Sequence, residues 1–386
     1  MRKGQLRFVG DDMAKVKLGD ICEIVSGSTP KTSIDEYWDG DIDWITPAEI
    51  SEDTYIVEES VRKLTQLGVE KTGLKPFPKG TVILSSRAPI GKVAIAGKEM
   101  YCNQGFKNLI CSDKVLPEYL YWFLRGNTAY LNSLGRGATF KEISKGIVAE
   151  IEISLPDKKE QQLSVDTLKK VWGVIVVRRQ ELEQLDLLIR ARFVELFGDP
   201  VNNPMGWEKR QLQEIVTDDC AVSYGIVQTG DNQEKGVPVF RPVDIVNRVP
   251  KLDELKKTTK EISNKYKRTI LKGREMLITV RANIADTCIV GEEFKGCNVG
   301  RGIVPIRTQE DIMVLEFLKY LMDSKHLNDD IKSKAKGITL IQLNMEDLRE
   351  VELIIPPLEQ QLGFVAFAEQ VDKSKVEGRM IIIGHR

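Results

Sequence analysis

Hydrophobic residues recur every seven positions along a stretch that contains no proline. From Glu160 to Phe197 the single interior glycine is Gly173. The repeated apolar positions are Leu168, Ile175, Leu182, Ile189 and Leu196, with Trp172, Leu185 and Phe193 beside them. This repeat, flanked by charges, predicts a helix with a coiled-coil seam, and Gly198 followed by Pro200 predicts where it ends. Roughly 37 residues at ~1.5 Å each predict a rod about 55 Å long.

A second helical pattern begins near Leu358. Leu362 and Val365 are its seam positions, and Val371 continues the apolar face. Because an apolar seam needs a partner, we expect this helix to pack against the first. The pattern predicts a helix as far as about Val376, and residues 377–386 contain two glycines and no heptad. We therefore expect the second helix to be shorter than the first.

The regions that precede the two helices mix strand-like and helix-like patterns. β-branched apolar runs entered through glycine predict strands, aromatic and leucine faces predict helices, and runs closed by proline predict short strands. The segments are strands at 81–86 and 275–280, helices at 118–126 and 314–323, and proline-closed strands at 151–156 and 351–356. The expected fold class is α+β, with domains built largely of short strands.

The chain also repeats itself in order. The matched pairs are 17–25 with 210–216, 47–50 with 242–245, 87–91 with 281–285, 103–105 with 298–300, 117–124 with 315–322, 137–139 with 337–339, 151–156 with 351–356 and 160–163 with 359–362. So many matches in one order predict duplicated domains in a pseudo-twofold repeat. The expected division is a lead-in at 1–15, a first domain at 16–156, a central spacer helix at 157–200, a second domain at 201–356 and a C-terminal spacer helix at 357–386.

Composition narrows the class of protein. The 386 residues are 42% hydrophobic and 29% charged, enough for two to three domains with real cores. No segment approaches the ~18 apolar residues of a membrane span, and no signal-peptide core is present, so we expect a cytoplasmic protein without membrane contact. None of the six cysteines forms a CxxC pair, and His326 and His385 are the only histidines. We therefore expect reduced, buried thiols and no metal site.

The net charge of −1 does not indicate a nucleic-acid ligand by itself. The charges are unevenly spread, however, with ten Lys and Arg against three acidic residues between Arg248 and Arg274. A solvated surface explains such a run equally well.

Several segments together resemble one family, the specificity (S) subunit of type I restriction–modification systems. They are VKLGDICEIVSGSTPK (16–31), WITPAEI (44–50), LSSRAPIGKVAI (84–95), NQGFKNL (103–109), the spaced pattern GATF…I…LP (137–156), the EQQ motifs at the starts of the two helices (160–162 and 359–361) and RFVELFGDP (192–200). The resemblance implies two target-recognition domains, each reading one half of a split sequence in double-stranded DNA, with two antiparallel spacer helices between the halves. It also implies modification subunits that carry S-adenosylmethionine and methylate adenine, and a restriction subunit that translocates and cleaves. The family's second helix is usually about as long as the first, so the early end expected here is a departure.

Candidate DNA contacts follow from the chemistry of base edges. Arginine pairs with guanine, whereas Asn and Gln pair with adenine, and binding residues favour strand ends and loops. In the first domain the candidates are Arg87, Lys92, Asn103, Gln104, Lys107, Arg136 and Lys141. In the second they are Arg281, Asn283, Asn298, Arg301, Lys334, Lys336 and Gln342. Each could instead be a solvated or capping side chain, and Arg87 and Arg281, which both repeats share, could hold the scaffold. We expect a bipartite, non-palindromic target.

Two other classes of protein remain open. A self-sufficient methyltransferase or nuclease would need its own catalytic motif, but the nearest methyltransferase match, at 203–206, lacks the second proline and the aromatic residue. We find no Gly-rich cofactor loop after a strand and no acidic pair with a lysine. A coiled-coil protein scaffold would not need duplicated globular domains. The sequence therefore favours a DNA reader without catalytic residues or a cofactor of its own.

Overall fold

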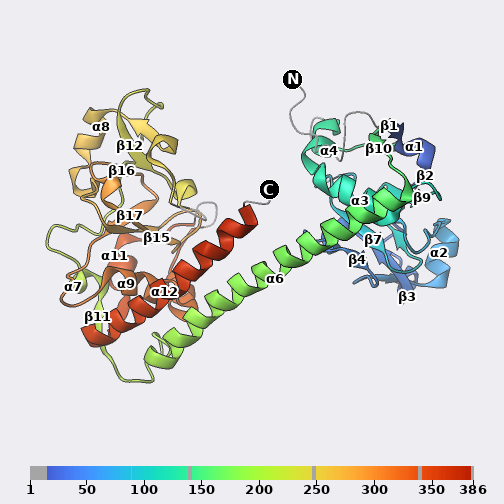
Figure 1. Ribbon diagram of the computed structural model, residues 1–386. Coiled ribbons are helices and arrows are strands. Elements are labelled where there is room, and N and C mark those ends of the chain that lie inside the picture. Colours follow the sequence, from blue (N-terminus) through green and yellow to red (C-terminus); the bar gives the residue numbers. More distant parts are fainter. Residues whose placement is uncertain (1–14, 88, 138–140, 246–248, 338–340, 384–386) are drawn as a thin grey trace. The chain divides into compact units, whose positions relative to one another are not determined.

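One long helix runs through the boundary between two compact units. The computed structural model describes residues 15–87, 89–137, 141–245, 249–337 and 341–383, with side chains described as far as Lys375. Unit 1 ends at Val177 and unit 2 begins at Arg178, and both residues lie inside α6 (Lys158–Phe197), which is continuous (Figure 1).

Short strands form the frame of unit 1. They are β1 (Lys15–Lys17), β2 (Cys22–Val25), β3 (Trp38–Ile45), β4 (Ile56–Val57), β5 (Lys63–Leu64), β6 (Val82–Leu84), β7 (Val93–Ala96), β8 (Tyr101–Cys102), β9 (Asn108–Cys111) and β10 (Glu152–Ser154). The helices are α1 (Leu18–Ile21), α2 (Gln66–Thr72), α3 (Pro117–Gly126), α4 (Thr128–Leu134) and α5 (Lys145–Ala149), with the 3-10 turns η1 (Asp35–Tyr37) and η2 (Pro47–Glu49). Two sheets, ordered β2-β9-β6-β7-β4 and β5-β3-β8, accompany a β1-β10 pair. Helix α3 packs on β6 and β7 and begins with proline in its first turn, where the missing N–H leaves no bond unmade.

Unit 2 repeats this plan. Its strands are β11 (Glu208–Gln211), β12 (Val237–Phe240), β13 (Lys256–Thr258), β14 (Glu275–Thr279), β15 (Thr287–Val290), β16 (Asn298–Val299), β17 (Ile303–Ile306) and β18 (Glu352–Ile355). Its helices are α7 (Leu212–Ile215), α8 (Lys260–Lys265), α9 (Leu315–Met322), α10 (Lys325–Ser333), α11 (Met345–Arg349) and α12 (Leu358–Ile383), with η3 (Pro242–Asp244), η4 (Leu252–Glu254), η5 (Lys267–Thr269) and η6 (Glu292–Phe294). The β13-β12-β16 and β15-β14-β17 sheets and the β11-β18 pair correspond to β5-β3-β8, β7-β6-β9 and β1-β10.

The predicted α+β repeat is thus confirmed. The predicted strands appear as β6, β14, β10 and β18, and the predicted helices appear as α3 and α9. The continuous apolar runs predict β6 and β14 because both strands are buried on both faces. The aromatic and leucine faces predict α3 and α9 because these faces lie in the core of each unit.

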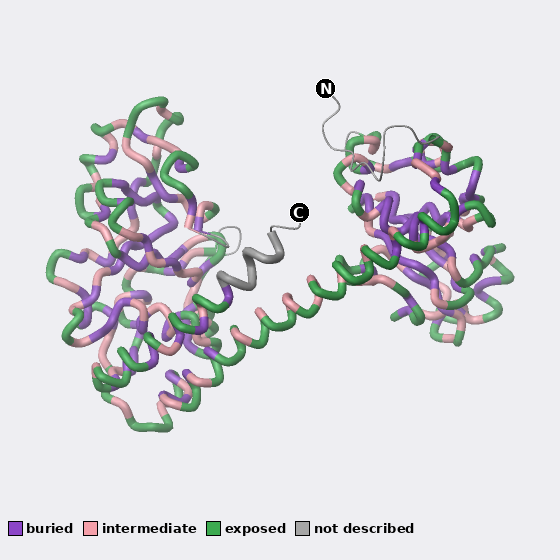
Figure 2. The backbone as a smooth tube through the Cα atoms, viewed as in Figure 1, coloured by how far each residue is buried: buried purple, intermediate pink, exposed green. Residues whose placement is uncertain are grey.

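Helix α6 contributes to both cores and is exposed between them (Figure 2). Val165 is buried in the core of unit 1, with Leu168 and Trp172 packed against it. Ile189, Phe193 and Phe197 are buried in the core of unit 2, with Leu185 and Leu196 packed against it. The remaining predicted seam residues, Ile175 and Leu182, are only partly buried and join neither core in the described structure.

Helix α12 packs antiparallel to the second half of α6. The ring of Phe364 lies 5.4 Å from Phe193 and 5.6 Å from Phe197, and contacts further along α12 reach earlier residues of α6. Of the two seam positions predicted on α12, Val365 is buried, whereas Leu362 is 51% exposed. Leu362 precedes Phe364 by two residues, about 200° around the helix, and so faces away from the core.

The end of α12 differs from the expected one. The helix continues beyond Val376 to Ile383, so the predicted end near Val376 is wrong. With 26 residues it is nevertheless shorter than α6, which has 40.

A buried glutamine fixes the start of each long helix. The side chain of Gln161 accepts a hydrogen bond from Leu116 N at 2.9 Å and donates to Lys114 O at 3.0 Å and Pro156 O at 2.8 Å. Gln361 makes the same bonds to Val314 N, Ile312 O and Pro356 O, at 2.9, 3.0 and 2.8 Å. Both side chains are fully buried. Matching the EQQ motifs by sequence pairs Gln161 with Gln360, one residue away from its structural counterpart.

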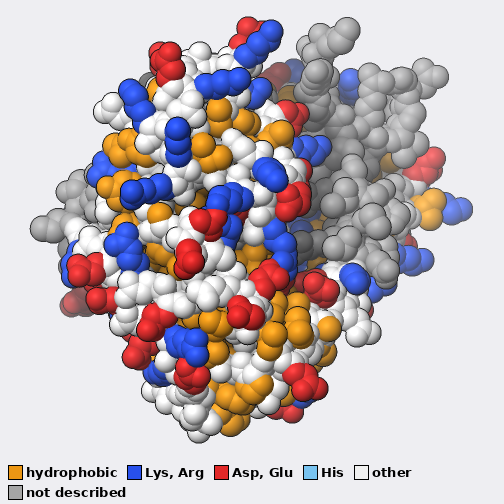
Figure 3. Space-filling view, turned by 90° about the vertical axis from the view of Figure 1, so that its left-hand side faces the viewer, with side chains coloured by type: hydrophobic (Ala, Val, Ile, Leu, Met, Phe, Trp, Pro, Cys, Tyr) orange, Lys and Arg blue, Asp and Glu red, His pale blue; other side chains and the backbone are white. Residues whose placement is uncertain are grey.

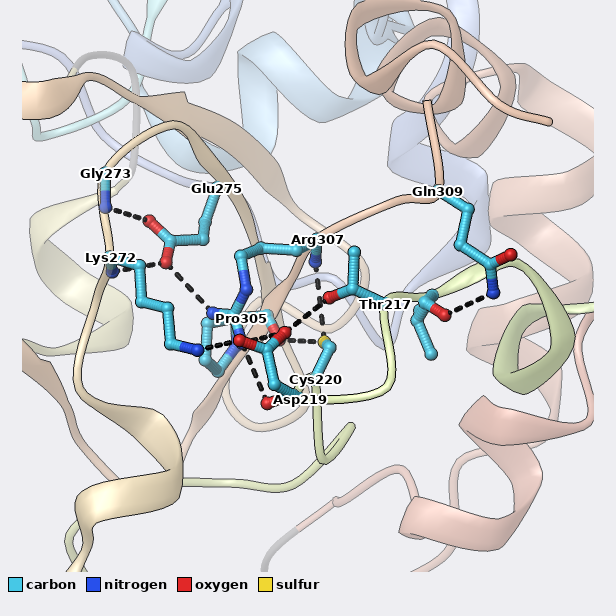
Figure 4. Close-up of polar contacts among 10 residues, drawn as sticks. Thr217, Asp219, Cys220, Lys272, Gly273, Glu275, Pro305, Arg307 and Gln309 are labelled. Carbon is cyan, nitrogen blue, oxygen red and sulfur yellow. Dashed lines mark hydrogen bonds and ion pairs between the residues drawn. The ribbon is translucent and has the colours of Figure 1, made fainter. Parts of the chain in front are cut away.

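A buried carboxylate fixes the turn into β14 (Figure 4). Glu275 is fully buried, accepts from the backbone N–H groups of Lys272 and Gly273, and lies 3.0 Å from Arg307 Nη1. Arg307 also donates to the carbonyl of Asp219 at 2.9 Å, which ties the segment before β12 to the central sheet of unit 2. Because the buried charge is paired, this network is structural and lies outside the predicted DNA contacts.

Candidate DNA interface

Three segments of unit 1 meet through their backbones. The segments begin at Ser86, Asn103 and Gly135 and contain all the candidate DNA contacts of the first domain. We call these three segments loop set 1. Ser86 N donates to Gly105 O at 2.8 Å, joining the first segment to the second. Arg136 and Glu142 exchange two backbone bonds of 3.0 and 2.9 Å, and Glu142 also bridges to Arg87. The loop that leaves α4 is thereby held beside the turn that follows β6.

Unit 2 has the same backbone arrangement in loop set 2, whose segments start at Val280, Gly300 and Ala335. Val280 N donates to Gly302 O at 2.8 Å. Lys336 and Gln342 exchange bonds of 2.9 and 3.0 Å, and Gln342 bridges to Arg281. The two loop sets therefore share one backbone frame.

This frame corrects the sequence match between residues 103–105 and 298–300. Asn103 N donates to Ile45 O at 3.1 Å, and in unit 2 it is Gly300 N that donates to Phe240 O, at 2.8 Å. Asn103 therefore corresponds to Gly300, two residues after Asn298. The short Asn-x-Gly pattern occurs in both repeats, but the chain between β15 and β17 is longer than its counterpart.

Asn298 is withdrawn from the candidate DNA contacts because its side chain is fully buried. Its Nδ2 donates to Ser263 Oγ at 3.0 Å, and its Oδ1 accepts from Thr269 Oγ1 at 2.8 Å. Asn298 thus joins α8 and η5 to β16, and its hydrogen-bonding capacity is used inside unit 2.

Other candidates hold the loops together. Lys92 Nζ donates to Pro47 O at 2.8 Å, and Asn103 Oδ1 accepts from Gly105 N at 2.8 Å. Lys107 is 7% exposed, and its Nζ lies 3.2 Å from Glu142 Oε1. Lys334 pairs with Asp330 at 2.9 Å. These bonds favour a scaffold role for the four side chains.

The remaining candidates present polar groups outward. The exposed ones are Gln104, Arg136, Lys141, Asn283, Arg301 and Lys336, while Arg87, Arg281 and Gln342 are partly buried. Each loop set thus holds both basic and amide side chains on segments that are joined through their backbones, a composition suited to phosphates and base edges.

The two loop sets differ in charge. In loop set 1, Glu142 supplies a carboxylate to Lys107. In loop set 2 the corresponding residue is Gln342, whose Oε1 accepts from Arg281 Nη2. Burial lowers the pKa of Arg281, and the nearby charge of Arg301 lowers it further. The Nε of Arg281 is buried without a hydrogen-bond partner in the described structure. Sequence reasoning missed Glu142, although its alignment with Gln342 could have identified it.

The basic run of unit 2 is spread over several elements. Figure 3 shows Lys and Arg side chains across the upper part of one face of this unit. The run includes Lys256, Lys257, Lys260, Lys265, Lys267, Arg268, Lys272 and Arg274. Lys256 donates to Gly230 O, Lys272 pairs with Asp219, and Arg274 pairs with Glu310 and Glu316. Part of the run therefore stabilises unit 2.

Other classes of site find little support. In the described ranges, no three His, Cys, Asp or Glu side chains gather as metal ligands would. All six cysteines are free, and only Cys111 is not fully buried. Helices with the length and hydrophobicity of a membrane span are likewise missing from the part of the chain that the structure describes.

Comparison with known proteins places the chain in a family. The family model for the type I restriction modification DNA specificity domain matches residues 10–187 and, a second time, residues 204–379. The chain belongs to this family. The two matches coincide with the two repeats seen in the fold.

Members of the family support the assignment over most of the chain. The type I restriction enzyme MjaIX specificity subunit of Methanocaldococcus jannaschii is 32% identical over 374 residues, covering 90% of this chain and 83% of its own. The EcoBI specificity subunit of Escherichia coli is 24% identical over 282 residues, covering 67% and 59%.

Solved structures of the same systems share the fold. One concerns the complex assembly and conformational transition of the type I R-M system; it aligns over 96% of this chain and 93% of its own, with a TM-score of 0.56 and 20% identity. The S subunit of a type I restriction–modification system from M. genitalium aligns over 98% and 94%, with a TM-score of 0.51 and 12% identity.

Proposed function

We propose that the chain reads a bipartite, asymmetric sequence in double-stranded DNA and directs adenine methylation and DNA cleavage by partner subunits. The observation that carries the proposal is the pair of loop sets, which share one backbone frame and differ in their exposed side chains. A shared frame can position two readers alike, while different side chains select different bases. Membership of the DNA specificity family supports this role.

The chemistry would belong to other polypeptides in the cytoplasm. Modification subunits would bind S-adenosylmethionine and methylate adenine, and a restriction subunit would translocate and cleave DNA. The chain itself would supply recognition, with no cofactor, metal or catalytic residue of its own.

Methyl transfer tests the proposal. The chain is expressed alone and together with the modification subunit encoded beside it, and transfer from S-adenosylmethionine to DNA is measured in both samples. We expect activity only in the mixture, and mapping of the methylated adenines should give a split, asymmetric motif.

Each other outcome identifies a different protein. Activity of the chain alone would indicate a self-sufficient methyltransferase. No methyl transfer in either sample would indicate a protein scaffold. A continuous or palindromic motif would contradict two different readers.

A further inference from the structure

One exposed position is held identically in both repeats but carries different side chains. In unit 1 two backbone hydrogen bonds fix the flanking residues: Asn103 N donates to Ile45 O, and Gly105 O accepts from Ser86 N. In unit 2 the same two bonds are made by Gly300 N and Gly302 O. The residue between them is Gln104 in one repeat and Arg301 in the other, and we call it the 104/301 position.

Close packing fixes the backbone on the C-terminal side of this position. A Cβ on Gly302 would overlap Pro242 in η3, and a Cβ on Gly105 would lie 2.9 Å from Asn103 Oδ1 and 3.0 Å from Pro47 in η2. The Gly302 site therefore excludes a side chain and the Gly105 site leaves little room for one, so the 104/301 position has little freedom to shift. A preorganised backbone lets a long side chain discriminate between bases at a lower entropic cost.

The side chains at the 104/301 position have the two chemistries that read bases in pairs of hydrogen bonds. An amide such as that of Gln104 matches adenine N6 and N7, and a guanidinium such as that of Arg301 matches guanine O6 and N7. Both side chains are exposed. Gln104 Oε1 accepts a bond from Thr29 Oγ1, which leaves a second lone pair on Oε1 and the NH₂ group for a base. Among the described residues, no hydrogen bond or ion pair engages Arg301.

The other exposed positions of the loop sets fit this role less well. Arg136 and Lys336 correspond to each other and are both basic, as a contact to the invariant phosphate backbone requires. Lys141 corresponds to Ile341 and Asn283 to Pro89, and neither Ile341 nor Pro89 has a side chain that can hydrogen-bond to a base. The 104/301 position alone among these carries base-reading groups of different preference.

We propose that the 104/301 position determines one base in each half of the target, with Gln104 selecting adenine and Arg301 selecting guanine. This inference rests on the proposed function. Loop set 2 also suits guanine electrostatically, because Arg281 and Arg301 lie together without the carboxylate that Glu142 provides in loop set 1. Guanine presents two acceptors to that excess of positive charge.

Reciprocal substitutions test the proposal. The full chain with its modification subunit is prepared as the native form, Gln104→Arg, Arg301→Gln and the double swap, and bound sequences are selected from randomised DNA. We expect Arg301→Gln to change one guanine to adenine in one half of the motif and to weaken binding to the native site about 5- to 150-fold. Gln104→Arg should cause the opposite change in the other half.

The controls separate failure of this inference from failure of the proposed function. Arg210→Gln alters an arginine that pairs with Glu208 on β11 and should leave the motif unchanged. Thermal unfolding shows whether each variant folds, and an Arg301→Met variant should also lose the guanine preference, because methionine has no hydrogen-bond donor for guanine O6 and N7. If the native complex selects a split motif that the swaps do not alter, or if Arg301→Gln weakens all sequences equally, the 104/301 position does not read a base. If the native complex selects no motif, the proposed function itself fails.

Discussion

Lys375 Nζ on α12 lies 2.5 Å from Asp186 Oδ1 on α6. The lysine is 8% exposed and also pairs with Asp372 at 2.6 Å, while Asp372 accepts from Tyr320 of α9. One ammonium thus connects both long helices and the helix that covers the β14 sheet. Burial by itself would lower the pKa of Lys375, but its bonds to the two carboxylates raise the pKa overall.

Replacing Lys375 should loosen the pairing of α6 and α12. Lys375→Met leaves two carboxylates close together without a cation. Because both carboxylates are about half exposed, we expect the free energy of unfolding to fall by only about 1–2 kcal/mol. Urea unfolding followed by circular dichroism measures the change. Lys373→Met, at an exposed position of the same helix, is the control; an equal effect of both variants would contradict the role of the ion pair.

The buried glutamines should tolerate substitution poorly. Gln161→Leu or Gln361→Leu leaves one backbone donor and two carbonyls without their partner, and we expect each to cost about 3 kcal/mol. Chemical denaturation tests this, with Gln360→Leu as an exposed neighbour. If the Gln361 and Gln360 variants are equally stable, the hydrogen bonds of Gln361 do not stabilise the helix start.

Acid should remove the contribution of the Asp43 carboxylate to the stability of the fold. Burial would raise the pKa of this carboxyl, but hydrogen bonds from Lys98 and Ser60 outweigh burial and hold the pKa below its ordinary value of 3.8. A lowered pKa stabilises the fold above pH 3.8, and this stability is lost as the pH falls through the folded-state pKa.

Asp43→Asn should therefore destabilise the protein by about 2 kcal/mol at neutral pH, with a penalty that shrinks in acid. Unfolding measured between pH 7 and about pH 3 tests the trend, since both pKa values are passed or approached there. Asp41→Asn, on the exposed side of β3, should show no comparable trend. A penalty for Asp43→Asn that is constant with pH would contradict the assignment.

Lys336 should contribute affinity without sequence preference. Its ammonium is exposed and lies 3.6 Å from Asp347. If it contacts phosphate, Lys336→Gln should weaken binding to matched and mismatched DNA alike, and the slope of log affinity against log salt should fall by about one. Titrations at several salt concentrations measure this, with Lys373→Gln as control. Loss confined to one sequence would indicate base reading instead.

The sequence predicted elements better than it predicted the positions of side chains. The strand β6 was predictable because it is a continuous apolar run that is buried on both faces, and the helix α3 was predictable because its apolar face is buried in the core. The burial of the Asn298 side chain could not be predicted, because it depends on hydrogen bonds to Ser263 and Thr269, which are distant in sequence. Likewise, no local pattern reveals that Lys92 bonds to the carbonyl of Pro47.

Repeat matching failed where the two copies differ in length. The shared Asn-x-Gly pattern matches Asn103 with Asn298 in the sequence. The backbone hydrogen bonds show instead that Asn103 corresponds to Gly300. Only this correction places Gln104 opposite Arg301. In a duplicated protein, a register defined by hydrogen bonds is therefore needed before corresponding side chains are compared.

The packing of α6 should make its middle open more easily than its ends. An isolated helix frays from its ends, but here the core residues Val165 and Phe197 hold both ends, while Val174 and Val177 in the middle are 54% and 53% exposed. In the free chain, amide hydrogen exchange along α6 should be slowest near its termini and fastest around Val174. The point of easiest local opening is then the point at which the chain passes from one unit to the other.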